Sequence, residues 1–209
     1  DDMSTVEVAL SKIDEKPPLH YFGNIGGYEK GVYEMGGNRV IVPTSRPFVE
    51  AVQGECPTWE KAFKQLMGFD SDSEYAEEQL IRSMGWLKQT RKAMRDPKED
   101  RQSQVYVWVG ETDSGKSWGQ KELLPKLIGR QIFLTAENVN DKFNDDMIAA
   151  ELINLSDASG KAGHEDRNKF TQRIKQLIAN PEGSVEAKFR GRVCLPQRQR
   201  FVVSCNPDG

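Results

Sequence analysis

The segment VYVWVGETDSGKS, residues 105–117, is the feature that most constrains the fold of this chain. Its first five residues are β-branched or aromatic and do not alternate with polar ones, which predicts a strand buried on both faces. The next eight fit the pattern G-x-x-x-x-G-K-[S/T], in which glycines let the backbone close around phosphate groups. A helix is expected from Lys116, and its N-terminus would add partial positive charge. The order of strand, loop and helix therefore predicts a phosphate-binding loop.

The residue types of this loop suit a nucleoside triphosphate with Mg²⁺, and we expect ATP. The Lys116 ammonium would reach the β- and γ-phosphates, and the Ser117 hydroxyl would be a ligand of Mg²⁺. The residues expected to contact the nucleotide are Gly110, Glu111, Thr112, Asp113, Ser114, Gly115, Lys116, Ser117 and Trp118.

Two further polar residues follow apolar runs of the chain. Asp157 ends the segment ELINLSD, and it is the candidate for an acid on a neighbouring strand that holds the Mg²⁺ shell or polarises water. A helix cap or a turn is the other interpretation of Asp157, and Glu151 and Asp146 are lesser candidates for the acid. Asn206 follows the run FVVS and could contact the γ-phosphate or orient the attacking water, although Asn-Pro is also an ordinary turn. With Lys116, Asp157 and Asn206 make up the predicted catalytic set.

The alternation of strands and helices from residue 101 onward predicts an α/β fold, a parallel sheet with helices on both faces. Strands are expected near 131–134, 152–155 and 201–204, and helices from Lys116 and near 167–178. Ahead of this core, a Gly-Gly step predicts a hairpin of strands 32–35 and 39–42, and helices are expected from Trp59 and Ser73. The predicted parts of the chain are a β-rich lead-in over 1–57, a helical subdomain over 58–100 and the core over 101–209.

Basic residues gather near the end of the chain. Residues 167–200 hold nine lysines and arginines against two glutamates, while the whole chain has a net charge of −3. Within VEAKFRGRV, alternation places the three cations Lys188, Arg190 and Arg192 on one face of a predicted hairpin, beside Phe189. Cations for phosphates and an aromatic ring for stacking favour a single nucleic-acid strand as the partner. A solvated edge hairpin, protected by its charges from strand pairing, is the alternative.

Composition excludes several classes of protein. Three widely spaced cysteines and two histidines do not make a disulfide framework or a zinc site. No apolar run has the roughly 18–20 residues of a membrane span. The N-terminal DDMSTVEVALSKIDEK is acidic and lacks the apolar segment of a signal peptide, so a cytoplasmic location is expected.

The order of these pieces resembles the superfamily-3 helicases of the AAA+ group of P-loop NTPases, and in particular the primase–helicase proteins of phages and integrated elements. The matching segments are GVYEMGGNRVIV, VYVWVGETDSGKSW, KFNDDMIAAELINLSD, RNKFTQRIKQLIAN and VEAKFRGRVCLPQRQRFVVSCN. The resemblance implies that Lys116 and Ser117 are Walker A residues, that Asp157 is the Walker B acid and that Asn206 is sensor 1.

The same resemblance implies an ATP-dependent DNA helicase motor that acts in phage or mobile-element replication. It further implies a ring of subunits, six in the usual case, translocation on single-stranded DNA, a primase domain or protein as partner, and the host cytoplasm as location if a phage encodes it. Lys188 and Arg190 would belong to a DNA-contacting hairpin. A motor of this superfamily that acts on RNA, and a small-molecule kinase that uses the same loop, are weaker alternatives.

Two features depart from the family pattern. The usual pair of Walker B acids is reduced to Ser156-Asp157, and the arginine finger that completes a neighbour's site is not found, because the chain ends at Gly209, just past sensor 1. Both departures favour a second hypothesis, an ATP-binding switch or scaffold module with weak hydrolysis and no unwinding.

Overall fold

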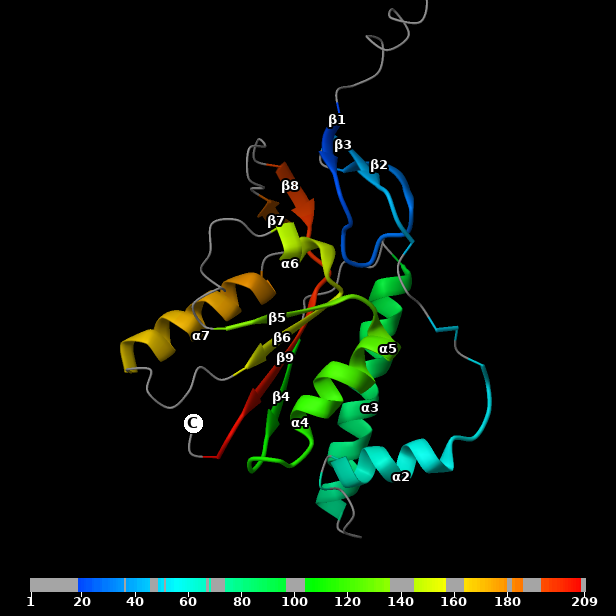
Figure 1. The fold of residues 1–209 in the computed structure, drawn as a ribbon, viewed down its shortest axis with the longest axis vertical. Helices are drawn as coiled ribbons and strands as arrows, with labels where there is room; N and C mark the ends of the chain where they lie inside the picture. Colours follow the sequence, from blue (N-terminus) through cyan, green and yellow to red (C-terminus); the bar gives the residue numbers. More distant parts are fainter. Residues whose placement is uncertain are drawn as a thin grey trace, which may run out of the picture.

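The core of the protein is a parallel sheet between two layers of helices (Figure 1). The computed structural model describes residues 19–35, 37–45, 49–50, 52–66, 68, 74–96, 104–135, 145–156, 164–179, 182–185 and 193–207. The four strands of the sheet lie in the order β4-β9-β6-β5, and every neighbouring pair is parallel. They are β4 (Val105–Val109), β5 (Gln131–Leu134), β6 (Leu152–Ser156) and β9 (Arg200–Cys205). The predicted α/β fold with a parallel sheet flanked by helices is thus confirmed.

Helices cover the two faces of this sheet unequally. Beyond the loop that follows β4, the chain is helical from Lys116 to Ile128, as α4 (Lys116–Trp118), a π-turn η1 (Gly119–Leu123) and α5 (Leu124–Ile128). It packs with α2 (Pro57–Leu66) and α3 (Glu74–Arg95) on one face, where Trp86, Trp108 and Leu124 belong to one buried cluster. Helix α7 (His164–Ala179) covers the other face through Ile174 and Leu177, and the short α6 (Asp145–Ala149) precedes β6. None of the described helices could cross a membrane.

Both expected N-terminal helices form. Helix α2 begins two residues before the expected Trp59, and α3 begins one residue after the expected Ser73. Helix α3 has Glu74 and Glu77 in its first turn and Lys92 and Arg95 in its last, an arrangement that stabilises the helix dipole. Helix α2 buries Phe63, whose ring stacks on Trp59 at 4.9 Å between centroids.

The lead-in forms a separate small sheet of strand order β1-β3-β2. Its strands are β1 (Leu19–Phe22), β2 (Gly31–Met35) and β3 (Asn38–Val42). The β2–β3 pair is antiparallel, which confirms the predicted hairpin, and Gly37 in its turn has φ of 78°. Strand β1 pairs with β3 in parallel and was not expected. The buried side chains of this sheet reach Ile148 and Leu195, so the lead-in packs against the core.

The segment with the predicted basic hairpin is flanked by a pair of antiparallel strands. They are β7 (Glu182–Val185) and β8 (Val193–Pro196). The four residues expected to contact nucleic acid, Lys188, Phe189, Arg190 and Arg192, lie outside the described residues. Their arrangement stays a prediction, although the pairing of the flanking strands is what a hairpin there requires.

Tyr106 of β4 packs against the buried cluster of Trp86 and Trp108, and its phenol can be titrated. Burial raises the pKa of its phenol, and the hydroxyl donates a hydrogen bond of 2.5 Å to Ser83 Oγ. Because the raised pKa favours the neutral phenol in the folded state, its stabilisation is full below the ordinary pKa of about 10 and is lost as the pH rises through the raised value.

We expect Tyr106→Phe to lower the free energy of unfolding at neutral pH by about 1 kcal/mol, because the hydrogen bond to Ser83 is lost. Above pH 10 the wild-type chain should lose stability more steeply than the variant. Urea unfolding at a series of pH values measures both effects. Parallel pH profiles for the two chains would contradict this account of Tyr106.

Candidate functional site

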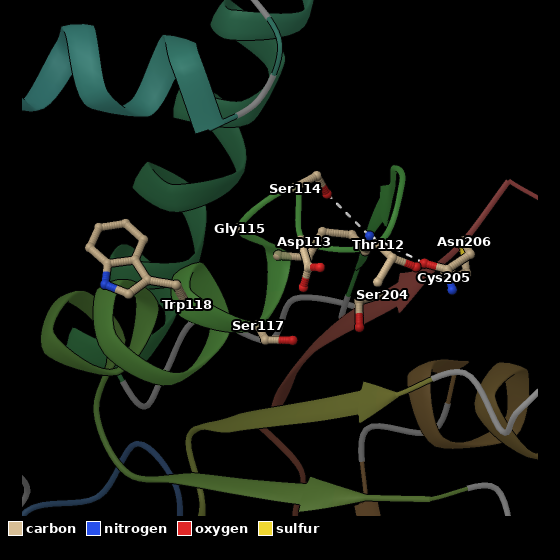
Figure 2. Close-up of a pocket in the computed structure, with 10 residues that line it drawn as sticks. Thr112, Asp113, Ser114, Gly115, Ser117, Trp118, Ser204, Cys205 and Asn206 are labelled. Atoms are coloured by element: carbon tan, nitrogen blue, oxygen red, sulfur yellow. Dashed lines mark hydrogen bonds between the residues drawn. The ribbon is translucent and has the colours of Figure 1, made fainter.

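The candidate site lies at the edge of the sheet where all four strands end. The strands are parallel, so the loop that follows β4 and the residue that follows β9 meet at one edge, the position where open α/β sheets bind ligands. Gly110 N–H donates to the carbonyl of Cys205 at 3.3 Å and extends the β4–β9 ladder to the first residue of the loop. A cavity of about 450 Å³ opens here, and its lining residues come from the loop and from the end of β9 (Figure 2). They are Thr112, Asp113, Ser114, Gly115, Lys116, Ser117, Trp118, Ser204, Cys205 and Asn206.

Helix α2 fixes the shape of the loop from behind. Gly115 has φ of 88°, a left-handed conformation that glycine adopts without strain. A Cβ built at Gly115 would lie 2.8 Å from Leu66 Cδ1, and one built at Gly119 would lie 2.7 Å from the Trp108 ring. The two glycines therefore let the backbone at the start of the helix approach α2 and β4 closely.

Lys116 is the centre of the polar contacts in the site. Its ammonium donates to the carbonyl of Gly110 at 2.5 Å and to that of Glu111 at 2.6 Å. It also contacts Ser114 Oγ at 3.2 Å and Asn206 Oδ1 at 3.3 Å. The last contact joins two residues 90 positions apart, and it shows that the loop and the end of β9 face one another.

Strand β9, which Asn206 directly follows, lies next to β4, the strand before the loop. Asp157 was expected on a strand beside that of the loop, but β9 lies between β4 and β6. Strand β6 ends at Ser156, at the same edge as the loop, and Asp157 itself lies outside the described residues. Its role remains a prediction.

The two lesser acid candidates are not near this edge. Glu151 precedes β6 at the opposite end of the sheet, where its fully buried carboxylate pairs with Arg130 at 2.8 Å. Asp146 is exposed on α6, which also precedes β6. The suggestion that either residue supplies the metal-binding acid is therefore wrong, because parallel strands put their first and last residues at opposite edges.

The other residues predicted to contact the nucleotide lie in the loop and in the short helix α4 that follows it. Thr112, Asp113 and Ser114 are exposed, and Ser117 is the second residue of the helix that follows them (Figure 2). Trp118 is 53% exposed, and Figure 2 shows its ring on the far side of the loop from Asn206. Sequence reasoning missed Ser204 and Cys205, which line the cavity beside Asn206, although their place at the end of the same strand was a signal for them.

Asp113 has an unfavourable backbone and an unfavourable charge for a phosphate site. It is the one described residue other than glycine with positive φ, at 64°, and its carboxylate lines the cavity. We expect Asp113→Asn to tighten ATP binding about 3- to 10-fold at low salt, because asparagine tolerates this backbone and removes a negative charge. Titration with a fluorescent ATP analogue at low and high salt measures the effect.

The gain should shrink at high salt, where the charge is screened. Glu77→Gln is the matched control, since Glu77 is exposed on α3 and does not line the cavity. Unchanged or weaker binding of ATP by Asp113→Asn at low salt would show that the carboxylate does not face the phosphates.

Residues 108–208 match the model of a family of unknown function (DUF5906). No curated protein matches the chain. The fold defines the chain as a parallel α/β protein with a glycine-rich loop at the carboxyl edge of its sheet.

Three solved structures of the NrS-1 C-terminal region share this fold. An A-form apo structure aligns with a TM-score of 0.61 at 20% identity, over 95% of this chain and 46% of that one. An apo structure of residues 305–718 gives 0.63 at 18% identity, over 97% and 48%. A further A-form apo structure of 305–718 gives 0.57 at 17% identity, over 97% and 47%. This chain therefore spans about half the length of the structures it resembles.

Proposed function

We propose that this chain is the motor core of a phage- or mobile-element-type replicative DNA helicase of superfamily 3, which binds and hydrolyses ATP with Mg²⁺. The observation that carries the proposal is the Lys116 ammonium between the loop carbonyls and Asn206, at the edge where the parallel strands end. The fold shared with the NrS-1 C-terminal region supports the α/β core, and the motif order of the sequence supports the replication role.

The residues of the cavity fit a nucleotide with its metal ion. Residues 112–117 line the cavity, and backbone N–H groups at the start of the helix there suit the approach of phosphate oxygens. Lys116 supplies a full positive charge within this cavity, and the Ser117 hydroxyl is the described candidate for a metal ligand. Bound ATP would supply the phosphoryl group that is transferred to water.

Each residue of the proposed site has a role that follows from its position. Lys116 neutralises charge at the outer phosphates and can exchange its bonds to the Gly110 and Glu111 carbonyls for bonds to phosphate oxygens. Asn206, which contacts Lys116, is the residue proposed to orient a water molecule or the terminal phosphate. Asp157, one residue beyond the end of β6, is the proposed partner of the metal shell.

Single-stranded DNA is the proposed nucleic-acid partner, bound by Lys188, Phe189, Arg190 and Arg192 between β7 and β8. We further propose a ring of copies, hexameric by the family resemblance, with a primase domain or protein as partner. In such a ring an arginine from the neighbouring copy would complete each nucleotide site.

The ATP-binding switch or scaffold stays the second candidate, for one structural reason. Among the described residues that line the cavity, Asp113 is the sole carboxylate, and it belongs to the loop itself. A strand-displacement assay separates the two functions, because the module would bind ATP without unwinding DNA.

Titration with ATP, ADP and AMP, each with Mg²⁺ or with EDTA, tests the nucleotide site directly. ATP and ADP should bind, and AMP should bind at least about 30-fold more weakly, because the loop and Lys116 contact the β- and γ-phosphates. Absence of ATP binding, or equal binding of AMP, would refute the nucleotide site.

A further inference from the structure

A chain of polar side chains, which begins at the buried Asn154 and ends at the surface, connects the helix after the loop with the strand β6. Gln131 of β5 donates from Nε2 to the carbonyl of Lys121 in η1, at 3.2 Å. Its Oε1 atom accepts a hydrogen bond of 2.9 Å from Nδ2 of Asn154 in β6. Two hydrogen bonds therefore join the π-turn, an edge strand and a strand whose carboxyl end lies at the candidate site.

The local sequence explains why the carbonyl of Lys121 receives a side chain. In a regular α-helix this carbonyl would accept from the N–H of residue 125, which is a proline and has no N–H. The helix widens into the π-turn Gly119–Leu123 just before Pro125, and the N–H of Leu124 reaches back to the carbonyl of Gly119. Such turns are frequent at functional sites. The Gln131 amide supplies the donor that Pro125 lacks.

Two buried amide atoms in or beside this series of hydrogen bonds have no partner among the described residues, which lowers the stability of the fold. Asn154 is completely buried, and its Oδ1 atom has no hydrogen-bond partner within the described part of the protein. Gln120, in the same π-turn, is buried with its Nε2 atom unpartnered in the same sense. A partly satisfied polar group inside a sheet is less stable than an apolar side chain of similar size. The neighbours of Asn154 along β6, Ile153 and Leu155, are apolar and fully buried.

We propose that Asn154 is a positioning residue, which fixes the carboxyl end of β6 relative to the helix that begins at Lys116. The π-turn follows directly on the helical turn that carries Lys116 and Ser117, and β6 ends two residues after Asn154. The chain Asn154–Gln131–Lys121 thus sets the distance between the two sides of the proposed Mg²⁺ site. This inference rests on the proposed function, and it adds a residue to it that contacts neither nucleotide nor metal.

Asn154→Leu tests the inference, because leucine is close in size and removes the buried amide. We expect Tm to stay unchanged or to rise by about 2–4 °C, since an unpartnered polar group is removed and the half-buried Gln131 can bond to water. The affinity for ADP without Mg²⁺ should stay within about twofold. The gain in affinity for a non-hydrolysable ATP analogue on addition of Mg²⁺ should fall at least about fivefold.

Thr90→Val is the matched control, because Thr90 is also fully buried and its Oγ1 atom has no partner among the described residues, but it lies on α3 outside the cavity lining. It should also stay as stable as wild type or become more stable, with the Mg²⁺-dependent gain intact. An intact gain in Asn154→Leu, or an equal loss in Thr90→Val, would overturn the positioning role while the proposed function stands. A wild-type chain that does not bind ATP would instead refute the proposed function, and with it this inference.

Discussion

Lys116→Ala will weaken ATP binding at least about 100-fold and abolish ATP turnover, because the ammonium is the one full positive charge among the described residues that line the cavity. Calorimetric titration and phosphate release measure the two effects. The fold should be unaffected, since within the described part of the chain the lysine bonds to loop carbonyls, to Ser114 and to Asn206, all at the site itself.

Lys126→Ala is the matched control for this change. Lys126 is exposed on α5, two turns beyond Ser117, and does not line the cavity. It should bind and hydrolyse ATP as the wild type does. If Lys116→Ala kept ATP affinity within about threefold of wild type, the loop would not be a phosphate site.

The largest effect on stability is expected at Glu151. Its carboxylate is fully buried and accepts hydrogen bonds from the Gly27 N–H at 3.2 Å, from the Arg130 N–H at 2.6 Å and from the Arg130 guanidinium at 2.8 and 3.2 Å. One side chain thus holds the lead-in, through Gly27, to the turn that precedes β5. We expect Glu151→Ala to lower the free energy of unfolding by about 3–5 kcal/mol, because the largely buried Arg130 loses its ion pair.

Glu78→Ala measures what an exposed ion pair contributes to the same fold. Glu78 and Arg82 are 2.6 Å apart one turn along α3, with both side chains more than half exposed. Such a pair is worth about 0.2–0.5 kcal/mol, so this variant should unfold at nearly the wild-type urea concentration. Equal losses in the two variants would show that Glu151 does not hold the lead-in to the core.

Local patterns in the sequence predicted the elements of the fold well. Strand β4, the loop and the helix from Lys116 follow from contiguous residues, and β5, β6 and β9 lie within a residue of their predicted bounds. Each depends on hydrophobic runs and glycines that act within a few positions. Strand β1 was missed because its pairing with β3 joins segments about 20 residues apart and has no local signal.

The order of the strands in the sheet could not be predicted from the sequence, because it depends on contacts between distant residues. The insertion of β9 between β4 and β6 depends on contacts across some 50 to 100 residues, so the neighbour of the loop strand could not be identified from spacing alone. Glu151 was considered as a metal-binding acid because an acid beside an apolar strand suggests one. Its actual partners, Gly27 and Arg130, lie 124 and 21 positions away.

The contacts of Asn154 also could not be predicted from the sequence. Within the sequence it only interrupts an apolar strand, whereas the structure shows its amide as part of a chain that reaches the helix after the loop. The roles proposed for Asp157 and for the residues between β7 and β8 still rest on motif and spacing alone.

The most direct test of the motor function is phosphate release from ATP by this chain, measured with and without single-stranded DNA, with Lys116→Ala as the background. The proposed function predicts hydrolysis that requires Mg²⁺ and rises several-fold when single-stranded DNA is added, in a particle of several copies. ATP binding with no hydrolysis above the Lys116→Ala background, in the presence of DNA and in an assembled particle, would contradict a motor and favour the switch or scaffold module.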